Sequence, residues 1–191
     1  MPILGITASG ITGSTISTSS YESIATVTVG SGGSSSIAFS SIPQTYKHLQ
    51  MRYISADARG TYSNSPVDMT FNGSSATAYD RHVLTGDGSN AASFAEINQN
   101  FIRLEGGANV ANTYLSGIVD ILDYTSTSKA KTVRSFSGID ANAGGNLAGE
   151  INLNSGLWYA TPAAITSITL TPYSSPFRQY TQFALYGIKG A

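Results

Sequence analysis

Hydrophobic and polar residues alternate with a period of two along most of the chain after residue 20. Such alternation is typical of β-strands that turn one face toward a core. Turn-forming Gly, Asn, Ser and Pro residues separate the alternating runs, and no long run has helical spacing. The pattern predicts roughly ten strands, the clearest of them at 21–30, 35–42, 47–56, 67–72, 79–84, 114–124, 132–139, 150–159, 165–172 and 180–187.

The C-terminal stretch from Ala164 to Gly190 shows the alternation most clearly, with a break at Pro176. It predicts two strands joined by a short turn. Because large apolar residues continue almost to the end of the chain, we expect the last strand to lie inside a sheet and close it. The runs 21–30 and 35–42, which flank a glycine-rich loop, predict a second hairpin.

Two segments depart from simple alternation. Ser93 and Glu96 fit a helix capping box, and apolar residues recur at helical spacing over 94–104, which predicts a short helical turn followed by a strand near Phe101. The apolar run 118–122 predicts a strand covered on both faces. Asp120 interrupts this run and therefore requires a partner, for which Lys131 and Arg134 on the next strand are the candidates.

These elements predict an all-β fold: an antiparallel β-sandwich, jelly-roll-like, with an extended N-terminal arm. The expected division is an arm at 1–20 and a β-sandwich domain at 21–191. No internal repeat of fixed period is visible, which argues against a propeller or a β-helix.

The arm is rich in Gly, Ser and Thr, carries no charge, and contains spaced apolar residues. Such a segment becomes ordered when a surface holds it, so we expect it to bind its own domain or, preferentially, another subunit. The alternative is an additional edge strand on the same domain. The predicted partner-binding anchors are Ile3, Leu4, Ile6, Ile11 and Ile16.

Composition narrows the range of functions. Only 11% of the residues are charged, the formal net charge is −1 and there is no Cys. This balance provides no basic surface for nucleic acid, and the missing thiols exclude disulfides and cysteine-ligated metals. The sequence contains no apolar stretch long enough to span a membrane and no signal peptide, which predicts synthesis in a cytoplasm without secretion by the general route.

No catalytic motif is present, so we expect neither enzymatic activity nor a cofactor. Asp80 and His82 would face the same side of a strand and could be drawn as a metal or acid–base pair, although a surface histidine is the favoured interpretation. A glycosidase would need two facing carboxylates, for which Glu96, Glu105 and Glu150 are the candidates.

Aromatic residues in or near the predicted loops are better candidates for recognition. Aromatic rings stack on sugars and anchor protein interfaces. For the single Trp158, packing in the core is the favoured alternative. The candidate surface-recognition residues are Tyr62, Tyr79, Trp158, Tyr159 and Tyr173.

Four stretches give the sequence a family resemblance: ITSITLTP at 165–172, QFALYGIKG at 182–190, YESIATVTVGSGGSSSIAFSSIPQTYKHLQMR at 21–52 and VDILDYTSTSKAKTVRSFSG at 119–138. In these stretches the chain resembles tailed-bacteriophage virion structural proteins. The resemblance implies a place in the virion and no catalytic residues.

Two functions follow from this resemblance. The favoured one is a capsid decoration or cement protein on the outer capsid surface, which contacts the major capsid protein and other virion proteins as a homo-oligomer, a dimer or trimer. The alternative is a tail-fibre or receptor-binding tip that recognises a host surface glycan. A tail fibre would carry a heptad stalk or a repetitive shaft, and neither is present.

Overall fold

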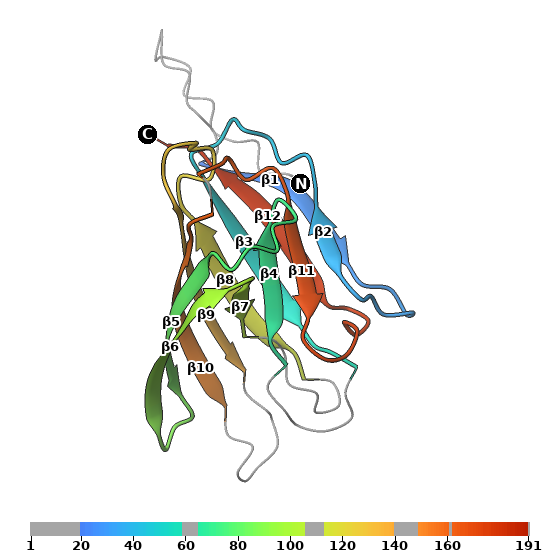
Figure 1. Cartoon of the computed structure of the whole chain (residues 1–191). Helices are drawn as coiled ribbons and strands as arrows, with labels where there is room; N and C mark the ends of the chain where they lie inside the picture. The colour runs from blue at the N-terminus through green and yellow to red at the C-terminus, as the bar shows by residue number, and fades with distance from the viewer. Residues whose placement is uncertain (1–19, 59–64, 106–112, 140–148, 161, 191) are drawn as a thin grey trace, which may run out of the picture.

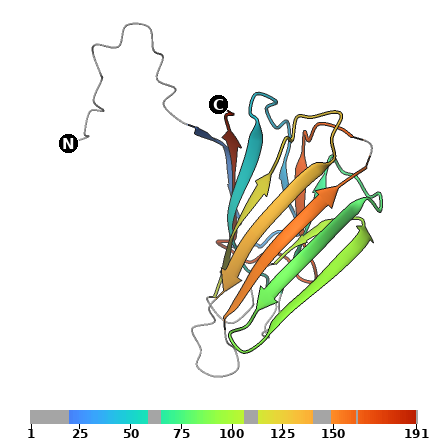
Figure 2. The ribbon, with the colours of Figure 1, turned by 90° about the vertical axis from the view of Figure 1, so that its left-hand side faces the viewer.

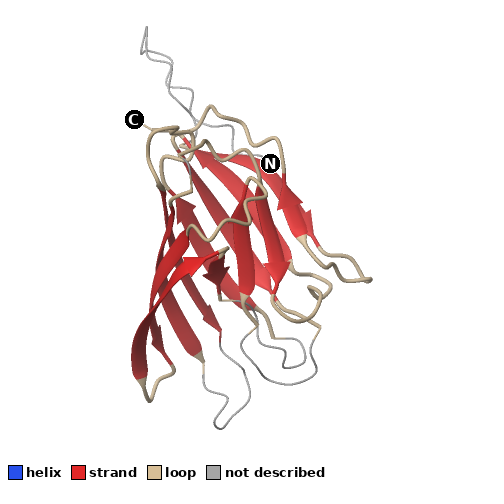
Figure 3. Ribbon diagram, viewed as in Figure 1, coloured by secondary structure: helices blue, strands red, loops and turns tan. Residues whose placement is uncertain are grey.

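The computed structural model describes residues 20–58, 65–105, 113–139, 149–160 and 162–190. These residues form strands and no helix (Figures 1 and 3). The strands build two antiparallel sheets packed face to face, which confirms the predicted all-β sandwich. The strands are β1 (Tyr21–Thr28), β2 (Ile37–Phe39), β3 (His48–Ser55), β4 (Val67–Phe71), β5 (Tyr79–Gly86), β6 (Ala91–Gln99), β7 (Ile102–Leu104), β8 (Leu115–Ile121), β9 (Lys131–Ile139), β10 (Glu150–Trp158), β11 (Ile168–Pro172) and β12 (Gln182–Ile188).

The two sheets differ in size. The large sheet has the strand order β1-β12-β3-β8-β9-β10-β5-β6, and the small sheet has the order β2-β11-β4-β7. Each strand of the small sheet is preceded and followed in the chain by a strand of the large sheet. The chain therefore crosses repeatedly between the sheets, an arrangement compatible with the expected jelly-roll connectivity. Figure 2 shows β9, β10, β5 and β6 side by side in the large sheet.

Both predicted hairpins are wrong, although their strands exist. β11 belongs to the small sheet and β12 to the large sheet, and the same division separates β2 from β1. Alternation shows that a strand has a buried face, but it does not identify the sheet that carries the strand. Consecutive strands can cover one core from opposite sides, as Leu170 on β11 and Leu185 on β12 do. The last strand does lie inside a sheet, between β1 and β3, as expected.

The predicted helical turn is also wrong, because residues 91–99 form β6, the edge strand that pairs with β5. Nearly every residue of β6 is exposed, including Phe94 at 45% and Ile97 at 58%. The spacing of its apolar residues therefore does not reflect a core-facing side. The strand expected near Phe101 is confirmed as β7.

The run 118–122 is buried on one side only, which corrects the prediction of a strand covered on both faces. Val119 is fully buried, whereas Ile118 is 40% exposed. Asp120 accepts a hydrogen bond from Gln50 Nε2 at 2.9 Å, and Arg134, one of the two candidate partners, is its direct cross-strand neighbour. Lys131 instead donates to the carbonyl oxygens of Ser126 and Lys129.

A stack of aromatic rings fills the centre of the core. The Tyr53 ring on β3 lies parallel to the Phe183 ring on β12 at a centroid distance of 5.2 Å, and Phe177 packs against Phe183 at 5.6 Å. Gly117 is the cross-strand neighbour of Tyr53. A Cβ atom at Gly117 would lie 2.4 Å from the Tyr53 ring, so the absence of a side chain there makes room for the ring.

We therefore expect Gly117→Ala to destabilise the fold by about 2–3 kcal/mol, because the buried Tyr53 ring has no space into which to move. Urea unfolding followed by tryptophan fluorescence measures the change.

Gly32→Ala is the matched control, since no atom lies within 4 Å of a Cβ at that position. Its free energy of unfolding should stay within about 0.5 kcal/mol of the wild-type value. Equal stability of the two variants would contradict the assigned role of Gly117.

Candidate interaction surface

Large apolar side chains lie exposed on the outer face of the large sheet, the face turned away from the small sheet. They come from neighbouring strands of the order β3-β8-β9-β10-β5. An outward face that meets water usually carries polar residues in alternation with the core. We call this set the outer apolar patch; it consists of Ile54, Leu84, Ile118, Phe136, Ile151 and Leu153, which are 40–59% exposed.

Strand register places four members of the outer apolar patch in one row. Ile118 on β8 is opposite Phe136 on β9. Phe136 is opposite Leu153 on β10, and Leu153 is opposite Leu84 on β5. Directly opposed side chains on one face lie about 5 Å apart, so these four form a continuous apolar surface.

A shallow hollow lies over β8 and β9 next to this row. Ile118, Phe136 and Ile151 form its apolar walls, and Gly138 lies between them. Ile151 is opposite Gly138 on one side and Gly86 on the other. Because both neighbours lack a side chain, the surface beside Ile151 is open to a protruding group from a partner.

The polarity of the two faces is inverted in this part of the sheet. Phe136 is 56% exposed, while its chain neighbours Ser135 and Ser137 are buried on the inner face. On β10, Leu153 is likewise 53% exposed between two buried asparagines, Asn152 and Asn154. In a free sandwich the apolar side chains would occupy the inner positions. The inversion leaves the apolar side chains of β9 and β10 exposed on the outer face.

A polar row borders the outer apolar patch on the side away from Ile151. Its members follow one another in register across β3, β8, β9, β10 and β5. Asp120 and Arg134 are direct cross-strand neighbours within it, so that an acidic and a basic residue lie side by side. The row consists of Gln50, Asp120, Arg134, Ser155 and His82.

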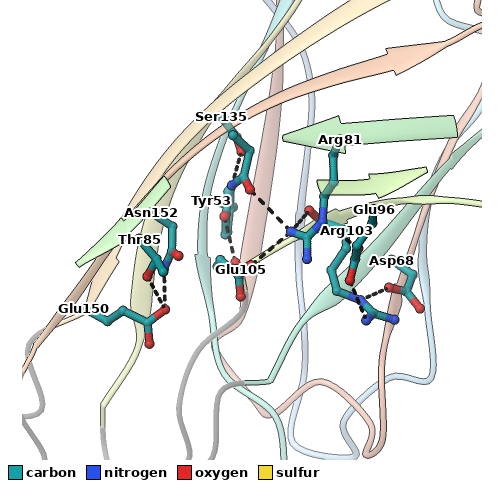
Figure 4. Close-up of polar contacts among 11 residues, drawn as sticks. Tyr53, Asp68, Arg81, Thr85, Glu96, Arg103, Glu105, Ser135, Glu150 and Asn152 are labelled. Carbon is teal, nitrogen blue, oxygen red and sulfur yellow. Dashed lines mark hydrogen bonds and ion pairs between the residues drawn. The ribbon is translucent and has the colours of Figure 1, made fainter. Parts of the chain in front are cut away.

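Inside the sandwich, Arg81 on β5 organises a buried polar cluster (Figure 4). The side chain is 4% exposed. Its Nε donates to Glu96 at 2.7 Å, and its Nη1 donates to Glu105 at 3.0 Å and to the carbonyl oxygen of Arg103 at 2.9 Å. Asn154 Oδ1 also accepts from Nη1 at 3.3 Å. A buried guanidinium is tolerated only with such partners, so the cluster ties β5, β6, β7 and β10 together.

A second arginine lies beside this cluster. Arg103 donates to Asp68 at 3.0 Å, and its guanidinium lies over the rings of Phe101 and Tyr173, 4.7 Å from each centroid. Burial raises the pKa of Asp68 above its usual value, although the Arg103 guanidinium acts in the opposite direction. The Tyr53 hydroxyl donates to the carbonyl oxygen of Glu105, and burial strongly raises the pKa of the Tyr53 hydroxyl.

The three glutamates considered as glycosidase carboxylates are all bound to other residues of the chain. Glu96 and Glu105 both bind Arg81, while Glu150 accepts hydrogen bonds from Thr85 and Asn152. Among the described residues, no three His, Asp or Glu side chains lie close enough to hold a metal ion. The clearest feature of this region is therefore its internal bonding.

Asp80 and His82, which could be drawn as a metal or acid–base pair, both lie on β5, and no contact joins them among the described interactions. Asp80 Oδ1 accepts a hydrogen bond from the backbone N–H of Asn98 at 2.7 Å. His82 is exposed in the polar row. The favoured interpretation of His82 as a surface histidine is confirmed.

Two of the predicted recognition residues lie in the core, which corrects their assignment. Tyr79 is fully buried, and its hydroxyl accepts a hydrogen bond from the backbone N–H of Phe71 at 3.0 Å. Trp158 is 4% exposed and packs against Phe71 and Tyr79. Both residues occupy inward positions of their strands, so the alternative of core packing is confirmed for Trp158.

Tyr159 and Tyr173 are exposed, at 37% and 59%, but the fold does not bring them together. Tyr173 bonds through its backbone to Pro66, just before β4. Tyr159 follows Trp158, which packs on Phe71 at the other end of β4. The remaining predicted residues, Tyr62 and the arm anchors Ile3, Leu4, Ile6, Ile11 and Ile16, lie outside the described residues.

Comparisons with protein-family models, with curated proteins and with solved structures identify no match for this chain. None of the described segments is a helix long and apolar enough to cross a membrane. The fold therefore defines the class, an antiparallel β-sandwich, and the surfaces described above are the basis for a proposal about function.

Replacing the buried arginine tests the role of the interior cluster. We expect Arg81→Met to lower the free energy of unfolding by about 3–5 kcal/mol, because it removes the cation that faces the buried carboxylate of Glu105. Urea unfolding monitored by circular dichroism measures the loss.

Lys189→Met removes the exposed ion pair with Glu22 and serves as the control. Since water already solvates both of those groups, the urea midpoint should not change measurably. A similar loss in both variants would show that Arg81 has no special structural role.

Proposed function

We propose that the protein is a bacteriophage structural protein without enzymatic activity, a capsid decoration or cement protein. In this proposal it binds the outer capsid surface and stabilises contacts between major capsid subunits. The observation that carries the proposal is the broad, exposed apolar face on a sandwich whose buried charges are bonded internally.

The outer apolar patch supports a role in protein binding. Soluble monomers rarely expose a contiguous apolar surface of this extent, and such surfaces mark interaction sites. Its position on paired strands matters as well, because strands hold their side chains in fixed positions and lose little conformational entropy on binding. A component that reinforces a shell needs rigidity of this kind.

The low charge of the chain supports attachment by apolar contacts. Only 11% of the residues are charged, with a net charge of −1. Attachment that depends on buried apolar area is weakened little by salt, whereas attachment through surface charges is screened. We therefore expect shell binding to persist at high ionic strength.

Purified empty shells of the virus test the proposal directly. The added protein should bind in many copies per shell and raise the melting temperature of the shell, because a ligand that binds only the assembled state stabilises it. Copy number from gel densitometry and melting by differential scanning calorimetry give the two readouts. Binding in a few copies at the tail alone would contradict the proposal.

A deletion of residues 1–20 tests the contribution of the predicted arm. We expect the shortened protein to lose shell attachment, because the spaced apolar anchors of the arm are removed, while the urea midpoint of the sandwich is retained. Normal decoration of shells by the deletion variant would contradict this role.

Tyr173 favours a second candidate, a receptor-binding tip that recognises a host glycan. Its ring is 59% exposed and is held on the Arg103 guanidinium, a geometry suited to stacking on a sugar. In this case Tyr173→Ala should reduce adsorption of the protein to host cells, and the copy number per particle should be low.

A further inference from the structure

We propose that the outer face of the large sheet is a two-fold interface with a second copy of this chain. The two copies pack sheet against sheet, so that each covers the outer apolar patch of the other. The proposal depends on the described strands β3, β8, β9, β10 and β5. It assigns to a second copy the same patch that supports the proposed function, so in the dimer attachment to the shell would depend on the predicted arm.

The extent of the face is suitable for a dimer. In the order of the large sheet, the six strands from β3 to β6 are about 30 Å wide, and the rows from the polar row to Ile151 extend about 20 Å along the strands. This face, with the polar row and β6 included, offers about 600 Å² per copy, close to the ~800 Å² per partner of stable interfaces. Paired sheets pack about 10 Å apart with interleaved side chains, which would remove the whole patch from water.

The inverted polarity of β9 and β10 indicates what kind of surface must cover this face. Their outward residues Phe136, Ile151 and Leu153 have the character of a sandwich core, while their inward neighbours are Ser and Asn. A sandwich core is completed by a second sheet with apolar residues of matching spacing. A second copy of the same sheet supplies that spacing.

Two charges of the polar row are complementary to each other across a two-fold axis, which favours a second copy over a different partner. In a two-fold interface, if one residue contacts a second residue of the other copy, that second residue contacts the first in the same way. The surface must therefore be complementary to itself. Asp120 on β8 and Arg134 on β9 are cross-strand neighbours of opposite sign. A two-fold axis parallel to the strands and between β8 and β9 places Asp120 of each copy over Arg134 of the other.

The same axis places Ile151 on β10 of each copy over Ile54 on β3 of the other, and Leu153 over Arg52. It places Ile118 of each copy over Phe136 of the other, because these residues are cross-strand neighbours in the adjacent row. The shallow hollow also lies over β8 and β9, so the two hollows would face each other across the axis. Two ion pairs would border the apolar contact.

Sedimentation equilibrium of the full chain tests the interface. The wild type should be a dimer at micromolar concentration. Phe136→Asp should raise the dimer dissociation constant by at least about 30-fold, because it places a carboxylate at the centre of the apolar contact. Tyr173→Asp is the matched control, since it changes an equally exposed aromatic residue elsewhere and should leave the dimer intact.

Charge reversal tests the position of the axis without altering the apolar patch. Asp120→Arg alone should weaken the dimer, because two like charges then face each other across the axis at both symmetric positions. The double variant Asp120→Arg/Arg134→Asp should recover dimerisation. Urea midpoints of all variants establish that the sandwich remains folded.

The proposal is overturned if the wild type remains monomeric at concentrations of tens of micromolar, or if Phe136→Asp dimerises like the wild type. A double charge reversal that stays monomeric overturns the assigned axis. A monomeric wild type whose Phe136→Asp variant loses shell binding would assign this face to the capsid instead, and would leave the decoration function standing without the dimer.

Discussion

The stack of Tyr53 on Phe183 is the contact on which most of the structure depends. Both rings come from the adjacent strands β3 and β12 of the large sheet, and Phe177, in the loop that follows β11, packs against Phe183 at an interplanar angle of 60°. Gly117 makes room for the Tyr53 ring on the neighbouring strand. The Tyr53 hydroxyl then donates to the carbonyl oxygen of Glu105, whose side chain binds Arg81. A single ring thus connects the apolar core to the buried polar cluster.

This connection accounts for part of the polarity of the inner face beneath β9 and β10. Ser135 and Asn154 are buried there, and Asn154 both donates to Ser135 and accepts from Arg81. Because a buried polar group must be hydrogen-bonded, the presence of Arg81 selects for small polar partners around it. The apolar residues of the same strands then occupy the outer positions. The inner polar cluster and the outer apolar patch are two consequences of one alternation.

The sequence predicted the strands well because alternation reflects burial directly. It did not predict which strands pair, since a strand with one buried face fits either sheet of a sandwich, as β11 and β12 demonstrate. It failed at β6 because an edge strand exposed on both sides has no core-facing period. The glycine that accommodates Tyr53 could not be recognised, since its role depends on a neighbour 64 positions away in the chain, on β3.

The candidate surface was hidden for a related reason. The consecutive apolar residues Ile118 and Val119 predicted a strand covered on both faces. The outer side of the strand is apolar, as that prediction requires, but the described part of the chain does not cover it. Alternation alone also does not show which face of a strand points toward the core. Phe136 lies between two serines, and this pattern fits an inward ring as well as an outward one. Only the register to Leu153 and Ile118 fixes its direction. Because those neighbours point the same way, the row forms one exposed apolar surface across β8, β9, β10 and β5.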